Sequence, residues 1–217
     1  MPRPELPSFL LLAAFLALLD RHERHRDAWV FANVPLQLVW ANVHGLFALG
    51  LAVCAIYLAA EVLRPLVAPD QRLDAGSAGR LAVVTVLAAL VCLVNPNGLE
   101  GALYPIQQFG MIGPPEDRGV FGSLIAELIP PIGGGREHSR PVLVLVGVLG
   151  FLSLAAMAWN WRRVHAADPL LWVAFAYLAL GANRNLALFS IVAAPILVRN
   201  ANAALDRRSI PRHAATA

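Results

Sequence analysis

The sequence contains no lysine and only two cysteines, and charged residues make up 14% of its 217 positions. An ordinary soluble domain has about 25% charged residues, whereas this chain is 58% hydrophobic and has a mean hydropathy of +0.62. The shortage of charge excludes an ordinary soluble domain and indicates a membrane protein. Cys54 and Cys92 both lie inside apolar runs, so we expect free thiols that pack as small hydrophobic residues.

Recognisable chemical motifs are also missing. The chain has no nucleotide-binding glycine loop, no zinc motif and no nucleophile elbow. It shows no internal repeat. No cofactor is evident from the sequence, which also does not predict whether a divalent cation binds. The basic pI of about 9.4 comes from arginines expected beside anionic headgroups, so it does not indicate nucleic-acid binding. Membrane lipid is the partner that this composition predicts.

Seven apolar runs, each bounded by Pro, Gly, Asn or charge, organise the chain: 8–19, 29–41, 46–63, 81–94, 142–159, 170–182 and 186–198. Only 46–63 and 142–159 approach the roughly 20 residues of a spanning helix. The runs are rich in Leu, Ala and Val without two-residue alternation, which favours helices in lipid. We predict an all-α, polytopic membrane bundle with about seven transmembrane segments, several short or hairpin-like. Pro35 and Pro195 should kink or break their runs.

The distribution of arginine predicts the orientation. If all seven runs cross, twelve arginines fall in connections on one side and five on the other, which nevertheless includes the longest connection, 95–140. Basic residues accumulate in cytoplasmic loops, so we expect the N-terminus outside and the C-terminus inside the cell. Residues 1–199 form the predicted membrane domain, 95–140 an outer loop with interfacial helices at 99–112 and 119–129, and 200–217 a basic cytoplasmic tail.

Three polar motifs, "NVHG" (42–45), "NPNG" (95–98) and "ANRN" (182–185), fall at the outer ends of helices in this arrangement. Two of them join runs too short to cross about 30 Å of hydrocarbon, so their turns should lie below the outer surface. Irregular backbone at that depth is tolerated where it is buried or lines a wet cavity. Asn42, His44, Arg184 and Asn185 are therefore predicted to border an outward-facing cavity that suits a polar headgroup.

Arg184 and His44 each have two interpretations. An intramembrane arginine usually has a partner or a function, and a guanidinium matches phosphate geometry; alternatively, Arg184 extends to the outer interface and caps a hairpin. His44 is either a phosphate contact or general base, or a turn imidazole bonded to a carbonyl, with Gly45 supplying backbone freedom.

Two further candidates lie elsewhere in the chain. Glu127, in "IAELIPP", is either a base or metal ligand near the cavity or a solvated interfacial carboxylate. His22 and His25, in "RHERHR", have helical spacing but lack a third ligand, so a solvated charged loop is expected rather than a metal site.

Taken in order, "RPEL", "WANVHGLFALGL", "NPNGLEGALYP", "IAELIPP" and "NRNLALFSIVAAPIL" resemble a family of bacterial polytopic proteins related to the GT-C membrane glycosyltransferases. The resemblance implies transfer from a polyprenyl-phosphate sugar at the outer face. It places Asn42, His44, Asn95, Gly98, Glu127, Arg184 and Asn185 around the lipid-phosphate or sugar cavity. The start "MPRPELP" resembles the interior of such an enzyme, so we expect a C-terminal portion without the acidic outer loop that carries the base.

The first functional hypothesis is therefore a GT-C-like glycosyltransferase or its C-terminal membrane part. The second is a non-catalytic membrane protein, either a degenerate relative or a subunit of an envelope assembly. Transport is disfavoured because the spans hold almost no ionisable residues.

Overall fold

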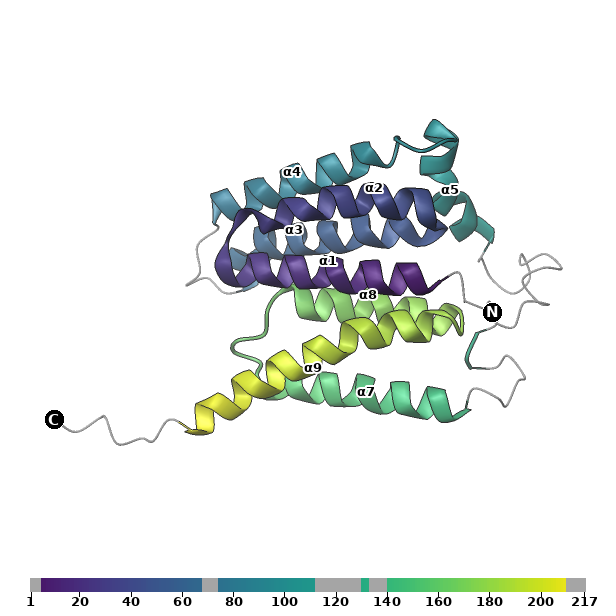
Figure 1. Ribbon diagram of the computed structural model, residues 1–217. Coiled ribbons are helices and arrows are strands. Elements are labelled where there is room, and N and C mark those ends of the chain that lie inside the picture. The colour runs from purple at the N-terminus through teal and green to yellow at the C-terminus, as the bar shows by residue number, and fades with distance from the viewer. Residues whose placement is uncertain (1–4, 68–73, 112–129, 133–139, 210–217) are drawn as a thin grey trace.

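The computed structural model describes residues 5–67, 74–111, 130–132 and 140–209, and the regular structure in these ranges is helical (Figure 1). The all-α prediction is confirmed. The helices, with two short 3₁₀ segments, are α1 (Leu6–His25), η1 (Ala28–Ala32), α2 (Asn33–Val43), η2 (Gly45–Phe47), α3 (Ala48–Val67), α4 (Ala75–Val91), α5 (Gly98–Met111), α7 (Arg140–Trp159), α8 (Ala167–Gly181) and α9 (Asn185–Ser209). Glu127, the predicted helix 119–129 and residues 210–217 of the predicted tail lie outside the described residues, whereas residues 200–209 of that tail belong to α9.

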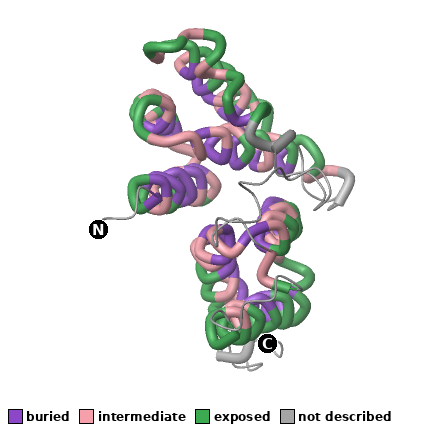
Figure 2. The backbone as a smooth tube through the Cα atoms, turned by 90° about the vertical axis from the view of Figure 1, so that its right-hand side faces the viewer, coloured by how far each residue is buried: buried purple, intermediate pink, exposed green. Residues whose placement is uncertain are grey.

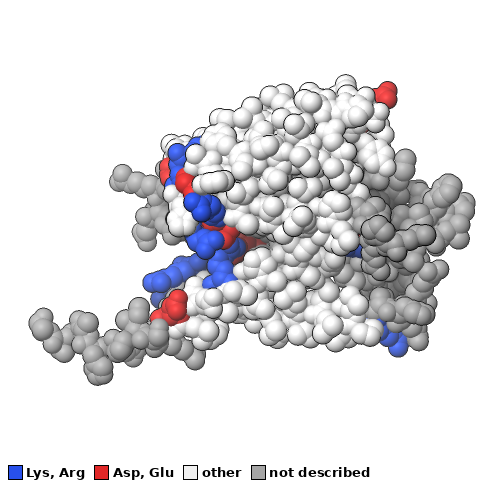
Figure 3. Space-filling view, viewed as in Figure 1, with Lys and Arg blue, Asp and Glu red and all other residues white. Residues whose placement is uncertain are grey.

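The long helices lie side by side and alternate in direction, so their connections fall at two opposite ends of the bundle (Figure 1). The end where α1 finishes and α4 starts holds Arg26, Arg64 and Arg80, and we call it the arginine end. The end where α2 finishes and α9 starts holds Asn42, Asn95 and Asn185, and we call it the asparagine end. Figure 3 shows charged side chains gathered at the arginine end, with an uncharged band over the helices on the same face.

Three helical stretches are long and apolar enough to cross a membrane: Gly45–Pro65, Arg140–Trp159 and Asn185–Asp206. The first two contain the runs that the sequence marked as long enough. The third is longer than its apolar run, because α9 continues past the run to Ser209. Helices α4 and α8 are apolar but shorter. Length and composition therefore support a membrane protein.

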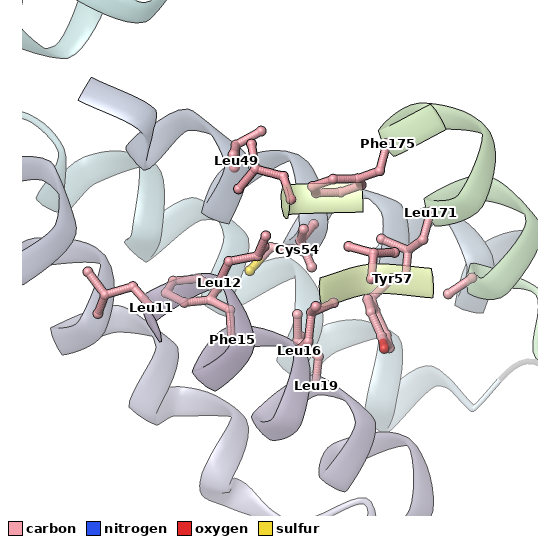
Figure 4. Packing of buried hydrophobic residues seen from close by; sticks show 14 of the residues in the cluster. Leu11, Leu12, Phe15, Leu16, Leu19, Leu49, Cys54, Tyr57, Leu171 and Phe175 are labelled. Carbon is pink, nitrogen blue, oxygen red and sulfur yellow. The ribbon is translucent and has the colours of Figure 1, made fainter. Parts of the chain in front are cut away.

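The core lies where α1, α3, α8 and α9 meet. Leu12, Phe15 and Leu19 of α1 are fully buried and face α3 and α8 in Figure 4. The ring of Phe15 meets that of Trp40 edge to face at 5.5 Å, an arrangement that the ring quadrupoles favour. Burying these side chains stabilises the fold by about 25 cal/mol for each Å² of apolar surface that is removed from water. In Figure 2 the buried residues lie on the inner sides of the helices.

Large apolar side chains also lie exposed on the outer helices. Val86 of α4, Leu145 and Phe151 of α7 and Tyr177 of α8 are each more than half exposed. A soluble monomer rarely exposes large apolar patches on its surface. These outward faces are consistent with contact with lipid.

The two prolines that were expected to kink or break their runs both lie inside helices. A 3₁₀ segment precedes α2, and Pro35 lies in the first turn of that helix, where a missing N–H breaks no intrahelical bond. The change from 3₁₀ to α-helix occurs at Ala32–Asn33, before the proline, and α2 continues through Pro35 without a break. Helix α9 continues through Pro195, so no break occurs there.

Candidate functional site

All three polar motifs lie at the asparagine end, and Asn42 ties two helix ends together there. Its side-chain amide donates to the carbonyl oxygen of Leu38 at 2.8 Å and to that of Val94 at 2.9 Å. The Leu38 carbonyl lies inside α2, one turn before Asn42, and the Val94 carbonyl lies in the turn after α4. The Asn42 side chain therefore links the end of α2 to the turn that follows α4.

Asn95 organises the turn between α4 and α5. Its amide donates to the carbonyl oxygens of Cys92 and Gly98 at 2.7 and 2.8 Å, and its oxygen accepts from the backbone N–H of Asn97 at 2.8 Å. Gly98 has φ +52, a left-handed conformation that favours glycine. Both residues therefore shape the turn.

Arg184 and Asn185 lie at the connection from α8 to α9. The Asn185 amide donates to the carbonyl oxygen of Leu178 at 2.7 Å, which ties the start of α9 to α8. The Arg184 Nε is buried without a hydrogen-bond partner. Within the described part of the chain, no carboxylate forms an ion pair with this guanidinium.

A pocket of about 640 Å³, which we call the polar pocket, opens between the ends of α2, α4 and α5. Asn42, His44 and Asn95 line it, as does the carboxylate-bearing Glu100. Glu100 is not among the residues that were predicted to border a cavity. Its helix, α5, begins and ends one residue before the predicted piece 99–112. The same helix also supplies Tyr104 and Gln107 to the pocket. Gly98 does not line it.

A second pocket of about 300 Å³, the apolar pocket, lies between α3, α8 and α9. Most of its lining is aliphatic, including Leu49, Leu178 and Leu188, while Arg184 and Asn185 line its polar margin. Gly45 borders both pockets. The structure thus divides the sequence candidates into two neighbouring groups, with Asn42, His44 and Asn95 in one and Arg184 and Asn185 in the other.

His44 is held from behind by two buried side chains. The Ser8 hydroxyl lies 2.9 Å from His44 Nδ1, and the indole N–H of Trp40 donates to that hydroxyl oxygen at 2.9 Å. Burial, together with the charge of Arg184, holds the pKa of His44 below its ordinary value. Both effects favour the neutral imidazole. The predicted carbonyl partner is replaced by the hydroxyl of Ser8.

The arginine end holds a set of buried charges that the sequence reasoning missed. Residues 20–25 form the last turns of α1, and His22 is 1% exposed. The predicted solvated loop is therefore wrong for His22. Its Nδ1 lies 2.9 Å from the carbonyl oxygen of Asp27 and its Nε2 lies 3.1 Å from the hydroxyl of Ser77.

One group of charges, the Glu61 cluster, comprises Glu23, Arg26, Glu61, Arg64 and His165. Glu61 is 1% exposed, and its carboxylate lies 3.0 Å from Arg26 and 2.9 Å from Arg64. Glu23 pairs with Arg64 and with His165, the latter at 2.9 Å. Burial alone would raise the pKa of Glu23, but His165, Arg64 and Arg26 outweigh it and lower that pKa to about 2.

The second group, the Asp168 cluster, comprises Asp20, Asp168, Arg199 and Asn200. Arg199 of α9 pairs with Asp20 of α1 and with the fully buried Asp168 of α8. Asn200 donates to Asp168 at 2.7 Å. The partners in these ion pairs come from different helices, so the two clusters join α1, α3, α8 and α9. Each guanidinium in the clusters already pairs with a carboxylate, so neither cluster offers a free positive charge to an anionic ligand.

The described part of the chain contains no recognisable metal site. There, no group of three or more His, Cys, Asp or Glu side chains is placed to hold a metal ion. Cys54 and Cys92 are free and buried, as predicted.

No protein-family model matches the chain, and no curated protein or solved structure matches it either. The function must therefore be argued from the two pockets and their side chains.

Proposed function

We propose that this chain is a multi-pass protein of the bacterial inner membrane that binds a lipid phosphate with a polar, sugar-like head at its outer face. The observation that carries the proposal is that Gly45 lines both the polar and the apolar pocket, beside Arg184, which has no carboxylate partner among the residues that the structure describes. In this arrangement the lipid chain occupies the apolar pocket and the head occupies the polar pocket. The phosphate lies between them.

The chemistry of the lining supports this division. A guanidinium without a protein carboxylate is suited to a phosphate, which it binds by charge-assisted, bidentate hydrogen bonds. Asn42 and Glu100 offer acceptors to sugar hydroxyls in the polar pocket. The two pocket volumes, about 300 and 640 Å³, fall in the range of small-molecule sites.

Binding of farnesyl phosphate to the chain in lipid nanodiscs tests the proposal, with farnesol as the probe that lacks the phosphate. Losing a hydrogen bond to a charged group costs about 1.5–3 kcal/mol, so Arg184→Ala should weaken farnesyl phosphate binding roughly tenfold to a hundredfold. Arg162→Ala removes the same charge from an exposed position at the arginine end and should leave affinity unchanged. Equal binding of farnesol and farnesyl phosphate would refute phosphate recognition.

For the reaction, we propose a GT-C-like transfer from a polyprenyl-phosphate sugar, which rests on the motif resemblance. The reaction is an inverting displacement at the anomeric carbon: the acceptor oxygen forms the new bond as the bond to the phosphate oxygen breaks. The phosphate then leaves with the electron pair, and Arg184 stabilises its charge. A general base, which we do not assign to any described residue, takes the acceptor proton. Arg184→Ala should abolish transfer while membrane insertion is retained.

A non-catalytic membrane subunit is the second candidate, and one observation favours it. The side-chain amides of Asn42, Asn95 and Asn185 already donate to backbone carbonyls, as expected of residues that only shape turns. This candidate predicts that no sugar transfer depends on a lipid-phosphate donor. It also predicts that the protein tolerates replacement of His44 or Arg184.

We further propose seven spans with the asparagine end outside, which supports an outward-facing pocket. Asn97 and Gly76 are both exposed, at the asparagine and arginine ends respectively. After Cys54 and Cys92 are replaced, Asn97→Cys should react with an impermeant maleimide in intact cells, and Gly76→Cys should react only in lysed cells. The opposite pattern would invert the topology.

A further inference from the structure

The ring of His44 is fixed by a relay of hydrogen bonds that starts in the core. Ser8 and Trp40 are fully buried. The indole N–H of Trp40 only donates, so the Ser8 oxygen accepts it at 2.9 Å, and the same oxygen lies 2.9 Å from His44 Nδ1. The relay therefore ends at Nδ1.

A backbone contact decides which ring nitrogen carries the proton. The N–H of Leu46 also meets His44 Nδ1, at 3.4 Å, as the side-chain cap of η2. A backbone N–H only donates, so Nδ1 is an acceptor and carries no hydrogen. The Ser8 hydroxyl hydrogen then also points at Nδ1. In the neutral ring the proton must be on Nε2.

In two other histidines the hydrogen-bond partners also indicate which ring nitrogen carries the proton. His165 Nδ1 accepts from the N–H of Ala167 at 3.3 Å, and its Nε2 lies 2.9 Å from a carboxylate oxygen of Glu23. The Arg64 Nη2 also lies near this Nε2, at 3.4 Å, but the Glu23 oxygen is closer, so we assign the proton of His165 to Nε2. His22 is the reverse, because its Nδ1 faces the carbonyl oxygen of Asp27 and must carry a proton.

His44 has the same tautomer as His165 but lacks the acceptor. Its Nε2 has no hydrogen-bond partner in the described ranges, and the residue lines the polar pocket next to Gly45, which also borders the pocket of Arg184. We infer that His44 is a tautomer-locked hydrogen-bond donor whose Nε2–H binds an anionic oxygen of the ligand's phosphate, opposite Arg184. Ser8 and Trp40 are its positioning residues.

The assignment rests on the proposed lipid-phosphate function and narrows it. A ring whose Nδ1 is occupied and whose Nε2 is protonated offers the pocket no basic nitrogen, so His44 is not the general base. It adds a second, neutral donor beside the guanidinium. A preorganised donor of this kind contributes to anion binding without further ordering on binding.

The tautomer can be measured without any ligand, by two-bond ¹H–¹⁵N correlation spectra of the full chain labelled with ¹⁵N-histidine in nanodiscs at pH 7. The expected pattern for His44 is Nε2–H, with His165 giving the same pattern and His22 protonated on Nδ1 as an internal contrast. The His44 signals are assigned by their loss in His44→Asn. A proton on Nδ1 of His44 would overturn the inference.

Binding of farnesyl phosphate then tests the donor with two matched variants. His44→Asn keeps an acceptor near Ser8 but has no donor at the Nε2 position, and should weaken binding roughly tenfold or more. His44→Gln has a longer side chain that restores an amide N–H near that position, and should bind within about threefold of the wild type. Equal losses in the two variants would overturn the donor assignment. Absent binding by the wild type would refute the proposed function instead, and the spectra would still decide the tautomer.

Discussion

Replacing Asp168 by asparagine removes one negative charge from the centre of the arginine end without changing the size of the side chain. Asp168 is fully buried in the first turn of α8. Its carboxylate accepts from the guanidinium of Arg199 and from the amide of Asn200, at 2.7 Å in the second case. An asparagine NH₂ group cannot accept either bond, so at least one donor loses its partner.

The expected cost follows from burial. Breaking a buried ion pair by removing one partner costs about 3–5 kcal/mol, and a negative charge in a first helical turn contributes a further few tenths to 1 kcal/mol, roughly. Arg199 keeps Asp20 as a partner, which places the loss near the lower value. We expect Asp168→Asn to lower the free energy of unfolding by about 3 kcal/mol.

Asp20→Asn is the matched control, because it removes the other carboxylate from the same guanidinium. The Asp20 side chain is 25% exposed, so water compensates part of the loss and about 1 kcal/mol is expected. Equilibrium unfolding in mixed micelles with increasing SDS measures both variants. A loss at Asp20 that equals or exceeds the loss at Asp168 would refute the argument from burial.

Two other predictions concern stability. A Cβ added at Gly50 would lie 2.2 Å from the Gln37 Oε1 and 3.1 Å from the ring of Phe15, so Gly50→Ala should cost about 1–3 kcal/mol in the same unfolding assay; an unchanged midpoint would contradict this packing. The pKa of Glu23 is lowered from 4.5 to about 2, so its contribution is complete above pH 4.5 and is lost as the pH falls towards 2. The wild type should therefore be more stable than Glu23→Gln by about 2 kcal/mol at pH 6, and this difference should vanish near pH 2; a constant difference would exclude the titration.

The helices were largely predictable because their signals are local. The apolar run 142–159 lies inside α7, the run 46–63 covers the end of η2 and most of α3, and the turn residues "NPNG" separate α4 from α5. Such runs and turns report backbone preference and burial directly in the sequence. The end of α1 was missed because residues 20–25 are polar, and their helical conformation depends on partners in α3, α4 and α9.

The candidate site was predictable only in part. The shared end of Asn42, Asn95 and Arg184 follows from alternating helix directions, which the order of apolar runs implies. Their separation into two pockets does not, because it depends on how α5 covers the end of α2 and how α9 packs on α8.

The sequence by itself determined that the chain is helical and apolar, with arginine concentrated at one end, since composition and hydrophobic runs act over short distances. The tertiary structure alone decided which charges are neutralised and which polar side chains line the two pockets. Asp20, Asp168 and Arg199 are far apart in the chain yet meet at one point, and Ser8 reaches His44 across 36 positions. Hydrogen bonds and ion pairs depend on separations of about 3 Å, and only the packing of the helices brings these groups that close.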